Sequence, residues 1–344
     1  MTAGMRFTVD GWDPGYGASL ELEGQLEQST ATVEVDVELP ASQWRPLGPA
    51  GREPLPDALL FVDGVRRIEA RVWIDSEVTG EGPATEATEA LCASYAAGVV
   101  CCCDQGAHLV ATELRRGLFS VAAHASDIST HAGSYKAHHV TSRAASVPVM
   151  VALSQSLQRR LAETEVIAAV DARTAVAGHA MAGPGDLLIV DGPLRGRQHL
   201  PRVLGYIKSH PPPHLPQDLN AVVAALAPGQ RTPVFLMGTT WDRHSWYLRL
   251  PGAPGSPWAG VVRLECPADL PAAEVTRLAN LSQRCLVRFA SAEYKDSRAP
   301  QNLYPIAGLE RELRRRLGDP RLLYRALREA SHPRPTDRQT SMPG

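Results

Sequence analysis

Two aspartates in this chain stand directly after a short apolar run and directly before a glycine. Asp63 follows Ala-Leu-Leu-Phe-Val, and Asp191 follows Leu-Leu-Ile-Val. An aspartate at the end of a buried strand lies where a sheet opens to solvent, on a rigid scaffold. If the two strands are adjacent, four carboxylate oxygens come within reach of one or two hard cations, and such ligands select Mg²⁺ or Mn²⁺. Paired ions of this kind hydrolyse phosphodiesters, so the pattern indicates metal-dependent hydrolysis.

Asp-Gly is also a favoured dipeptide in tight hairpin turns. Asp63 is followed by an alternating segment, residues 65–74, so a hairpin with Asp63-Gly64 at its turn is expected, and the aspartate then has a turn-forming alternative to a metal role. Asp191 is the stronger candidate for a metal ligand, because proline at position 193 ends its strand and leaves the charged side chain at the end of that strand.

A helix predicted over residues 147–172 lies between the two aspartates and carries Glu163 and Glu165. Residues two positions apart on a helix point in different directions, so only one of these acids can reach a metal. Spacing does not decide which one, and a solvated helix face is the alternative for either.

The remaining pattern predicts a mixed α/β protein. A β-rich segment over residues 1–56, with an alternating strand at 31–39, precedes a main domain over residues 57–331. Within that domain we expect an antiparallel meander, including a second hairpin around Asp104-Gln105-Gly106. Residues 107–146 are largely irregular, further strands follow from 186, and the end is a disordered tail over 332–344. Two C-terminal helices are expected over residues 305–317 and 320–330, with Gly318 ending the first and Asp319 capping the second.

Composition excludes several classes. The sequence has no uninterrupted apolar run of the ~18 residues that a membrane span requires, and its first residues lack a signal peptide's basic and apolar regions, so a cytoplasmic location is expected. There is no glycine-rich phosphate loop, which removes an ATPase or Rossmann interpretation. The six cysteines show no CxxC spacing and are interpreted as buried apolar residues, not as a zinc site or a disulfide framework.

The net charge of −2 gives no global basic surface for a polyanion, but the cations are unusual: 32 arginines and only three lysines. Lys295, Arg298 and the run 314–316 are candidates for phosphate contacts, with a solvated helix face as the alternative for the run. Aromatic residues interleave with arginines between 241 and 263, including Arg249, which suits stacking on single-stranded bases; aromatic residues in strands are otherwise core residues.

Taken in order, the motifs FVDGV, a helix with an acid, LLIVDGPL, GYIKSH and KDSRAPQNLYPIAGLE resemble those of the NurA nuclease family, over about residues 58 to 318. The resemblance implies an RNase H-like mixed sheet core flanked by helices, with Mn²⁺ or Mg²⁺ as cofactor and DNA as substrate. It further implies a homodimer docked on a hexameric HerA-type ATPase that translocates DNA during end resection and double-strand break repair.

Residue by residue, Asp63 and Asp191 match the family's metal-binding aspartates, and Glu163 or Glu165 matches its helix acid. Lys208 matches the lysine of the "IK" motif, and Tyr304 matches the tyrosine of a C-terminal Tyr-Pro. These matches imply a two-metal site. The family commonly carries an Ala-His shortly after the Tyr-Pro, whereas this chain has Leu309-Glu310-Arg311-Glu312. Glu310 or Glu312 is then the candidate for the last ligand.

Two other functions compete with a nuclease. One is a catalytically impaired adaptor or DNA-binding partner of the ATPase, which the missing histidine favours and the retained Asp63, Asp191 and Lys208 oppose. The other is a module that binds single-stranded nucleic acid through the arginine and aromatic segment.

Overall fold

The computed structural model describes residues 7–9, 32–51, 54–75, 86–141, 147–177, 185–208, 215–239, 241–252, 258, 260–292, 294–296 and 298–332. The predicted tail is therefore outside the described residues apart from position 332, as are most of the first 31 residues of the predicted β-rich segment.

The described strands form one mixed sheet, in the order β2-β10-β11-β12-β9-β8-β3-β4-β5-β7-β6, with β1 paired to β3. Their bounds are β1 (Phe7–Val9), β2 (Thr32–Glu34), β3 (Ala58–Asp75), β4 (Ala87–Cys103), β5 (Gly106–Ser120), β6 (Ile128–Thr130), β7 (Gly133–His139), β8 (Asp186–Asp191), β9 (Val203–Ile207), β10 (Phe235–Gly238), β11 (Asp242–Arg249) and β12 (Val261–Pro267). The helices are α1 (Val149–Ala177), α2 (Gln217–Ala224), α3 (Ala272–Leu286), α4 (Tyr304–Arg316) and α5 (Pro320–Ser331), with short 3-10 turns at Ala41–Gln43 and Val287–Phe289.

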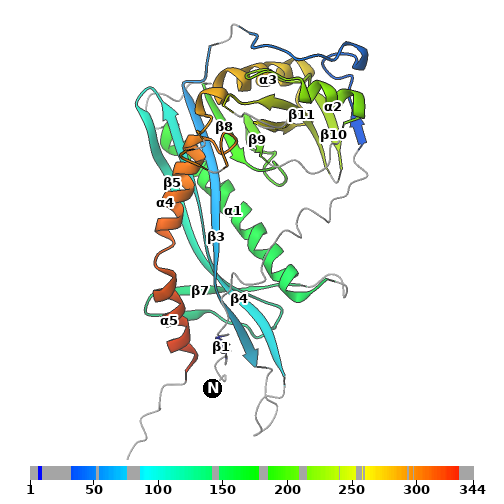
Figure 1. Ribbon diagram of the computed structural model, residues 1–344. Coiled ribbons are helices and arrows are strands. Elements are labelled where there is room, and N and C mark those ends of the chain that lie inside the picture. The colour runs from blue at the N-terminus through cyan, green and yellow to red at the C-terminus, as the bar shows by residue number, and fades with distance from the viewer. Residues whose placement is uncertain are drawn as a thin grey trace, which may run out of the picture.

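The molecule is tall, because β3, β4 and β5 run far beyond the shorter strands that pair beside them (Figure 1). The long strands pair antiparallel with one another, while β8 pairs parallel with both β3 and β9. The predicted mixed α/β architecture, a large mixed sheet flanked by helices, is confirmed.

The apolar residues of β3 and β8 alternate between two cores on opposite faces of the sheet. Leu60 and Val62 of β3 pack with Leu188 and Val190 of β8 against small residues of α1. The intervening residues, including Phe61, join the core beneath α3 and the start of α4. Each fully buried apolar side chain of this size stabilises the fold by about 1.5–3 kcal/mol, so this two-sided pattern fixes which residues face which helices.

The expected hairpin at Asp63-Gly64 is wrong. β3 is continuous over 18 residues, and Asp63 and Gly64 pair with Gly98 and Ala97 of β4 within a stretch of the ladder that runs without a register shift from Leu59 to Ile68. The local preference of Asp-Gly for a turn is overridden because the residues before and after it both pair with β4. Continuing the strand is more favourable than giving up this pairing to form a turn.

Other differences are smaller. Most of the segment predicted as irregular, residues 107–146, is in β5, β6 and β7, and the strand expected at 31–39 covers only Thr32–Glu34. Helix α3 was not predicted. The hairpin at residues 104–106, the helix α1, the strand ending at Asp191 and both C-terminal helices are confirmed.

The boundary between α4 and α5 follows the sequence signals. Gly318 has the left-handed φ of 85° that ends α4, and the Asp319 side chain accepts hydrogen bonds from the backbone amides of Arg321 and Leu322 to begin α5.

Candidate metal centre and groove

Asp63 and Asp191 lie side by side on neighbouring parallel strands. The ladder between β3 and β8 places Val62 opposite Val190, and each aspartate is the next residue along its strand. Both side chains fall on the face that carries α3 and α4, because they continue the alternation of Phe61 on β3 and Ile189 on β8. After Asp191 the chain turns away through Gly192, whose φ is 99°.

Glu310 completes the cluster from α4. One carboxylate oxygen from each of Asp63, Asp191 and Glu310 lies within 4.8 Å of the others. The approach of α4 depends on Gly98, the residue paired with Asp63 on β4, because a Cβ there would lie 3.1 Å from the side chains of Leu309 and Leu313. A glycine opposite the aspartate thus lets the helix seat its acid beside the strand.

The three acids crowd negative charge into a buried place. Burial raises the pKa of Asp63 well above its usual value, and the charges of Asp191, Glu165 and Glu310 raise it further against the lowering effect of Lys208. Oδ1 of Asp63 accepts a hydrogen bond from the amide of Gly64 at 2.7 Å, while Oδ2 is buried without a hydrogen-bond partner among the described residues. A buried carboxylate oxygen without a partner, beside two further carboxylates, fits a hard divalent cation of the Mg²⁺ or Mn²⁺ class.

Lys208 borders the cluster at the end of β9. Its Nζ lies 2.7 Å from Oδ2 of Asp191 and donates to Oδ1 of Asn302 at 2.8 Å. Burial raises the pKa of Asp191, although the Lys208 ammonium opposes that shift. Asn302 in turn donates to Asp296 at 2.6 Å, which fixes its amide orientation toward the lysine.

Arg298 holds Glu310 from outside the cluster. Its guanidinium donates to both carboxylate oxygens of Glu310, at 3.0 and 2.5 Å, and it also pairs with Asp296. Burial raises the pKa of Glu310, but the hydrogen bond and charge of Arg298 outweigh burial, so the pKa is lowered overall. Arg298 was predicted to contact DNA; in this structure it positions a candidate ligand.

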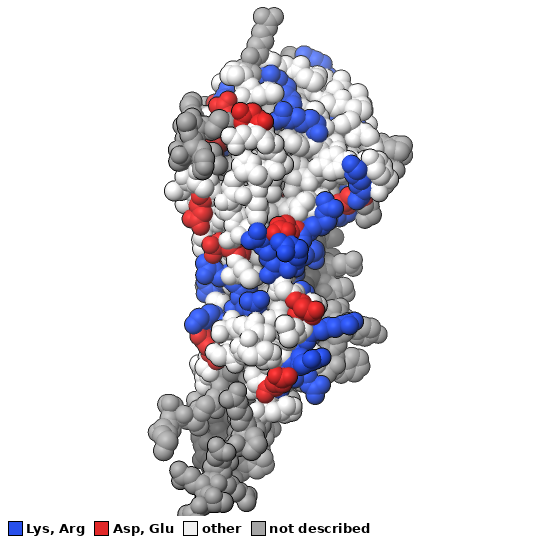
Figure 2. Space-filling view, turned by 90° about the vertical axis from the view of Figure 1, so that its left-hand side faces the viewer, with Lys and Arg blue, Asp and Glu red and all other residues white. Residues whose placement is uncertain are grey.

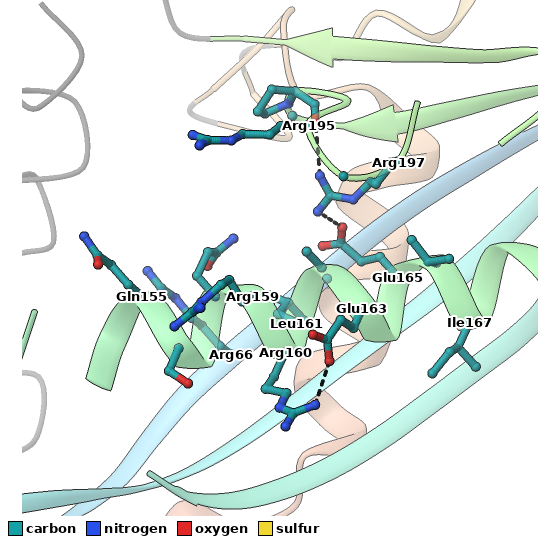
Figure 3. A pocket seen from close by; sticks show the side chains of 18 of the residues that line it. Arg66, Gln155, Arg159, Arg160, Leu161, Glu163, Glu165, Ile167, Arg195 and Arg197 are labelled. Atoms are coloured by element: carbon teal, nitrogen blue, oxygen red, sulfur yellow. Dashed lines mark hydrogen bonds and ion pairs between the residues drawn. The ribbon is translucent and has the colours of Figure 1, made fainter. Parts of the chain in front are cut away.

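Of the two helix acids, Glu165 is the one that lies near Asp63. Gly64 points toward α1, and a Cβ on it would lie 2.6 Å from Oε1 of Glu165. Glu165 is buried and forms an ion pair with Arg197, whereas Glu163 is exposed and pairs with Arg160 on the other side of the helix (Figure 3). Burial raises the pKa of Glu165, and Arg197 opposes the shift. Glu165 approaches from the face opposite the cluster of three acids, as a neighbour of Asp63.

A large groove opens beside these acids. It has a volume of about 1740 Å³ and is bordered by Asp63, Asp191, Glu165, the first half of α1 and the turn after β8. Its lining is strongly cationic, with Arg66, Arg159, Arg160, Arg195, Arg197 and Arg314. Figure 3 shows Arg159, Arg195 and Arg66 around the space beside α1. An acidic centre in an arginine-lined groove suits an anionic polymer whose backbone the arginines hold.

Basic side chains also gather at mid-height on the face that carries α4 and α5, with acidic side chains among them (Figure 2). The exposed arginines of α4 include Arg315 and Arg316, which both pair with Glu312. Glu312 is therefore engaged at the surface, and Glu310, two residues earlier on α4, is the acid that joins Asp63 and Asp191.

The other predicted site residues lie apart from the cluster. Tyr304 is partly exposed at the first turn of α4, where the Lys295 ammonium sits 5.1 Å from its ring centre. Arg249 is buried, and its guanidinium donates to the carbonyl of Ala224, so it does not present a free surface charge to DNA. Trp246 is also fully buried and donates to Ser282, which places it in the core and removes it from base stacking.

Several contributors to the site were not predicted from the sequence. Arg197 and Arg195 follow Asp191 within six residues, and their nearness to a strand-end acid is a signal that could have pointed to them. Asn302 and the two glycines, Gly64 and Gly98, carry no local signal, because their roles come from contacts between distant segments.

Among the described residues, no helix is long and apolar enough to cross a membrane. No known family profile matches the sequence, and no curated protein matches it. Among solved structures, the fold is similar to the NurA nuclease from Sulfolobus solfataricus, with 9% identity, coverage of 83% of this chain and 88% of that chain, and a TM-score of 0.42. With so low an identity and TM-score, this likeness carries no weight for function.

Proposed function

We propose that this protein is a divalent-metal-dependent nuclease that hydrolyses DNA in the arginine-lined groove. The observation that carries the proposal is the cluster of Asp63, Asp191 and Glu310, with oxygens within 4.8 Å of one another, of which Asp63 and Asp191 line that groove. Oxygen-only ligands and a buried carboxylate oxygen without a partner favour Mg²⁺ or Mn²⁺.

The residues divide the work by position. Asp63, Asp191 and Glu310 hold the metal, and Glu165 adds negative charge from the far side of β3 while Arg197 fixes its orientation. The groove arginines hold backbone phosphates, and Lys208 presents a compact cation next to Asp191. A divalent ion held by these acids would polarise the scissile phosphate and lower the pKa of a bound water.

A second candidate function is an adaptor that binds DNA without cutting it. The observation that favours it is that side chains of the protein itself neutralise the acids. Lys208 forms an ion pair with Asp191, and Arg298 donates hydrogen bonds to both carboxylate oxygens of Glu310. A site balanced in this way persists without a cation, and it has to loosen the grip of Arg298 before Glu310 can serve as a ligand.

Mn²⁺-dependent degradation of labelled DNA separates the two functions. We expect the wild-type protein to cut, Asp63→Asn and Asp191→Asn to lose at least about 100-fold in rate, and Glu163→Gln to cut normally. Glu163 is the matched control because it is an acid on the same helix that also lines the groove but pairs with Arg160 and is not part of the carboxylate cluster. Cutting by the two aspartate variants at the wild-type rate would refute the assignment, and DNA binding without cutting by any form would support the adaptor.

On the ordered motifs alone, we further propose an RNase H-like core, a homodimer, and a hexameric HerA-type ATPase as partner in DNA end resection. Sedimentation of the full-length chain, alone and with such an ATPase, tests the assembly. A monomer that does not co-sediment with the ATPase at micromolar concentrations would contradict it.

A further inference from the structure

The tip of the β4–β5 hairpin brings together two cysteines and a histidine. Cys101 and Cys103 are two residues apart on β4, so both side chains fall on the same face of the strand. His108 on β5 is the direct cross-strand partner of Cys101. Both thiol sulfurs and a ring nitrogen of His108 lie within 4.8 Å of one another.

The strand pairing, and not the sequence spacing, creates this group. The two-residue turn at Asp104-Gln105 closes the hairpin directly beside it, with Gly106 at a φ of 95°. Sequence spacing alone favoured buried apolar cysteines, because Cys101 and Cys103 lack a CxxC pattern and His108 has no partner along the chain.

The chemistry of the three ligands selects a borderline or soft cation. Thiolate and imidazole ligands together favour Zn²⁺, with Zn–S bonds of about 2.3 Å and Zn–N bonds of about 2.0–2.1 Å. Such a site needs ligand atoms roughly 3.3–3.8 Å apart, so ligand atoms that already lie within 4.8 Å of one another have to approach by about 1.5 Å at most. The adjustment is easy at His108, because its exposed ring makes only a long contact of 3.4 Å to the carbonyl of Gly106.

A disulfide or a reactive thiol fits less well. Two residues apart on a strand, Cα atoms are about 6.6–6.8 Å distant, at the upper limit for a disulfide. Burial raises the pKa of the Cys101 thiol to about 12, so without a metal it is a poor nucleophile.

We propose that Cys101, Cys103 and His108 bind a zinc ion at the tip of the β4–β5 hairpin, with the fourth coordination position taken by water. The ion ties the two strands together beside their turn. This centre is separate in residues and in chemistry from the carboxylate cluster, since hard Mg²⁺ or Mn²⁺ ions prefer the oxygens of Asp63, Asp191 and Glu310.

Cobalt substitution tests the proposal on the full-length chain. The protein is reduced, stripped of metal and titrated with Co²⁺, and absorption is recorded in the near ultraviolet. We expect a thiolate-to-cobalt charge-transfer band that saturates at one equivalent and disappears when Zn²⁺ is added. A carboxylate site gives no such band, so Asp63→Asn should retain it even if the nuclease proposal fails.

Variants assign the band to its ligands. The Cys101→Ser/Cys103→Ser double variant should lose the band, and Cys102→Ser should keep it, because Cys102 lies between them and points to the opposite face, into the core under α3. Circular dichroism checks that each variant is folded. His108→Gln changes an exposed side chain, so it leaves folding intact, and it should weaken zinc binding by at least about 10–100-fold.

The proposal is overturned if the wild-type protein shows no charge-transfer band. It is equally overturned if the band survives in the double variant, vanishes in Cys102→Ser, or if His108→Gln binds zinc as tightly as wild type.

Discussion

Gly64 on β3 and Glu165 on α1 are in such close approach that a Cβ atom on the glycine would lie 2.6 Å from Oε1 of the glutamate and 2.7 Å from Cδ1 of Leu161. The absence of a side chain at position 64 therefore sets how near α1 and its acid come to Asp63. The glycine after Asp63 thus allows close packing against α1 and does not form a turn.

Gly64→Ala should consequently push α1 away from the sheet. We expect a loss of about 1–3 kcal/mol in the free energy of unfolding, measured by urea denaturation, together with reduced Mn²⁺-dependent cutting as Glu165 is displaced. Gly308→Ala is the control, since nothing lies within 4 Å of a Cβ there and alanine within a helix gains about 0.5–1 kcal/mol over glycine. Equal stability of Gly64→Ala and wild type would show that α1 does not rest on this contact.

Asp63→Asn should stabilise the metal-free protein at neutral pH. The folded-state pKa of Asp63 is raised by burial and by its acidic neighbours, so the folded chain holds this proton more tightly than the unfolded chain. Below about pH 4, the ordinary pKa of aspartate, the carboxyl is protonated in both states and the variant has no advantage. As pH rises above that value, Asp63 ionises in the unfolded chain before it does so in the folded one, which destabilises the wild-type protein. The difference in stability between variant and wild type should therefore widen until pH passes the folded-state pKa. Thermal melts of both proteins in EDTA from pH 4 to 8 measure this difference in stability. A difference that does not change with pH would contradict the raised pKa of Asp63.

Lys208→Met should destabilise the metal-free protein. The substitution leaves the largely buried Asp191 and Asn302 without their cationic partner, at a cost of about 1–3 kcal/mol. Mn²⁺ should restore much of this loss, because a bound cation replaces the missing charge. Lys136→Met is the control, since its pair with Asp127 is exposed and its loss should hardly move the melting temperature. A melting temperature of Lys208→Met that equals the wild-type value in EDTA would remove Lys208 from this role.

Arg159→Ala and Arg314→Ala should weaken DNA binding through lost phosphate contacts. Both residues line the groove, and each contact removed should lower the slope of log affinity against log salt by about one. Binding is measured by fluorescence anisotropy with metal omitted, across a salt series. Arg325→Ala on α5 is outside the groove and should bind as wild type does; a loss in that variant equal to the other two would place DNA elsewhere.

The site residues that the local sequence pattern could predict are those at the ends of strands and on helices. The buried run before Asp191 predicted its strand correctly, and helical spacing placed Glu163 and Glu165 on one helix. Which glutamate turns inward depends on how α1 crosses β3, and that crossing is set by Gly64, an interaction between segments about a hundred residues apart. The Asp-Gly turn signal at Asp63 failed because sheet pairing on both sides outweighed a local preference. Glu310 became a candidate through motif order, while its ion pair with Arg298 emerges only in three dimensions.

The continuity of β3 and β4 past the acids has a mechanical consequence. Asp63 lies within β3, and β4 pairs with β3 on both sides of that position, without a register shift from Leu59 to Ile68, so the two strands form one continuous pair there. A movement imposed at the far end of these strands carries Asp63 with it, whereas Asp191, Glu165 and Glu310 are on β8, α1 and α4. Widening of the groove to admit a polymer must therefore come from its borders outside β3 and β4, which are α1, residues 139–141 and 147, the turn after Gly192 and Arg314 on α4.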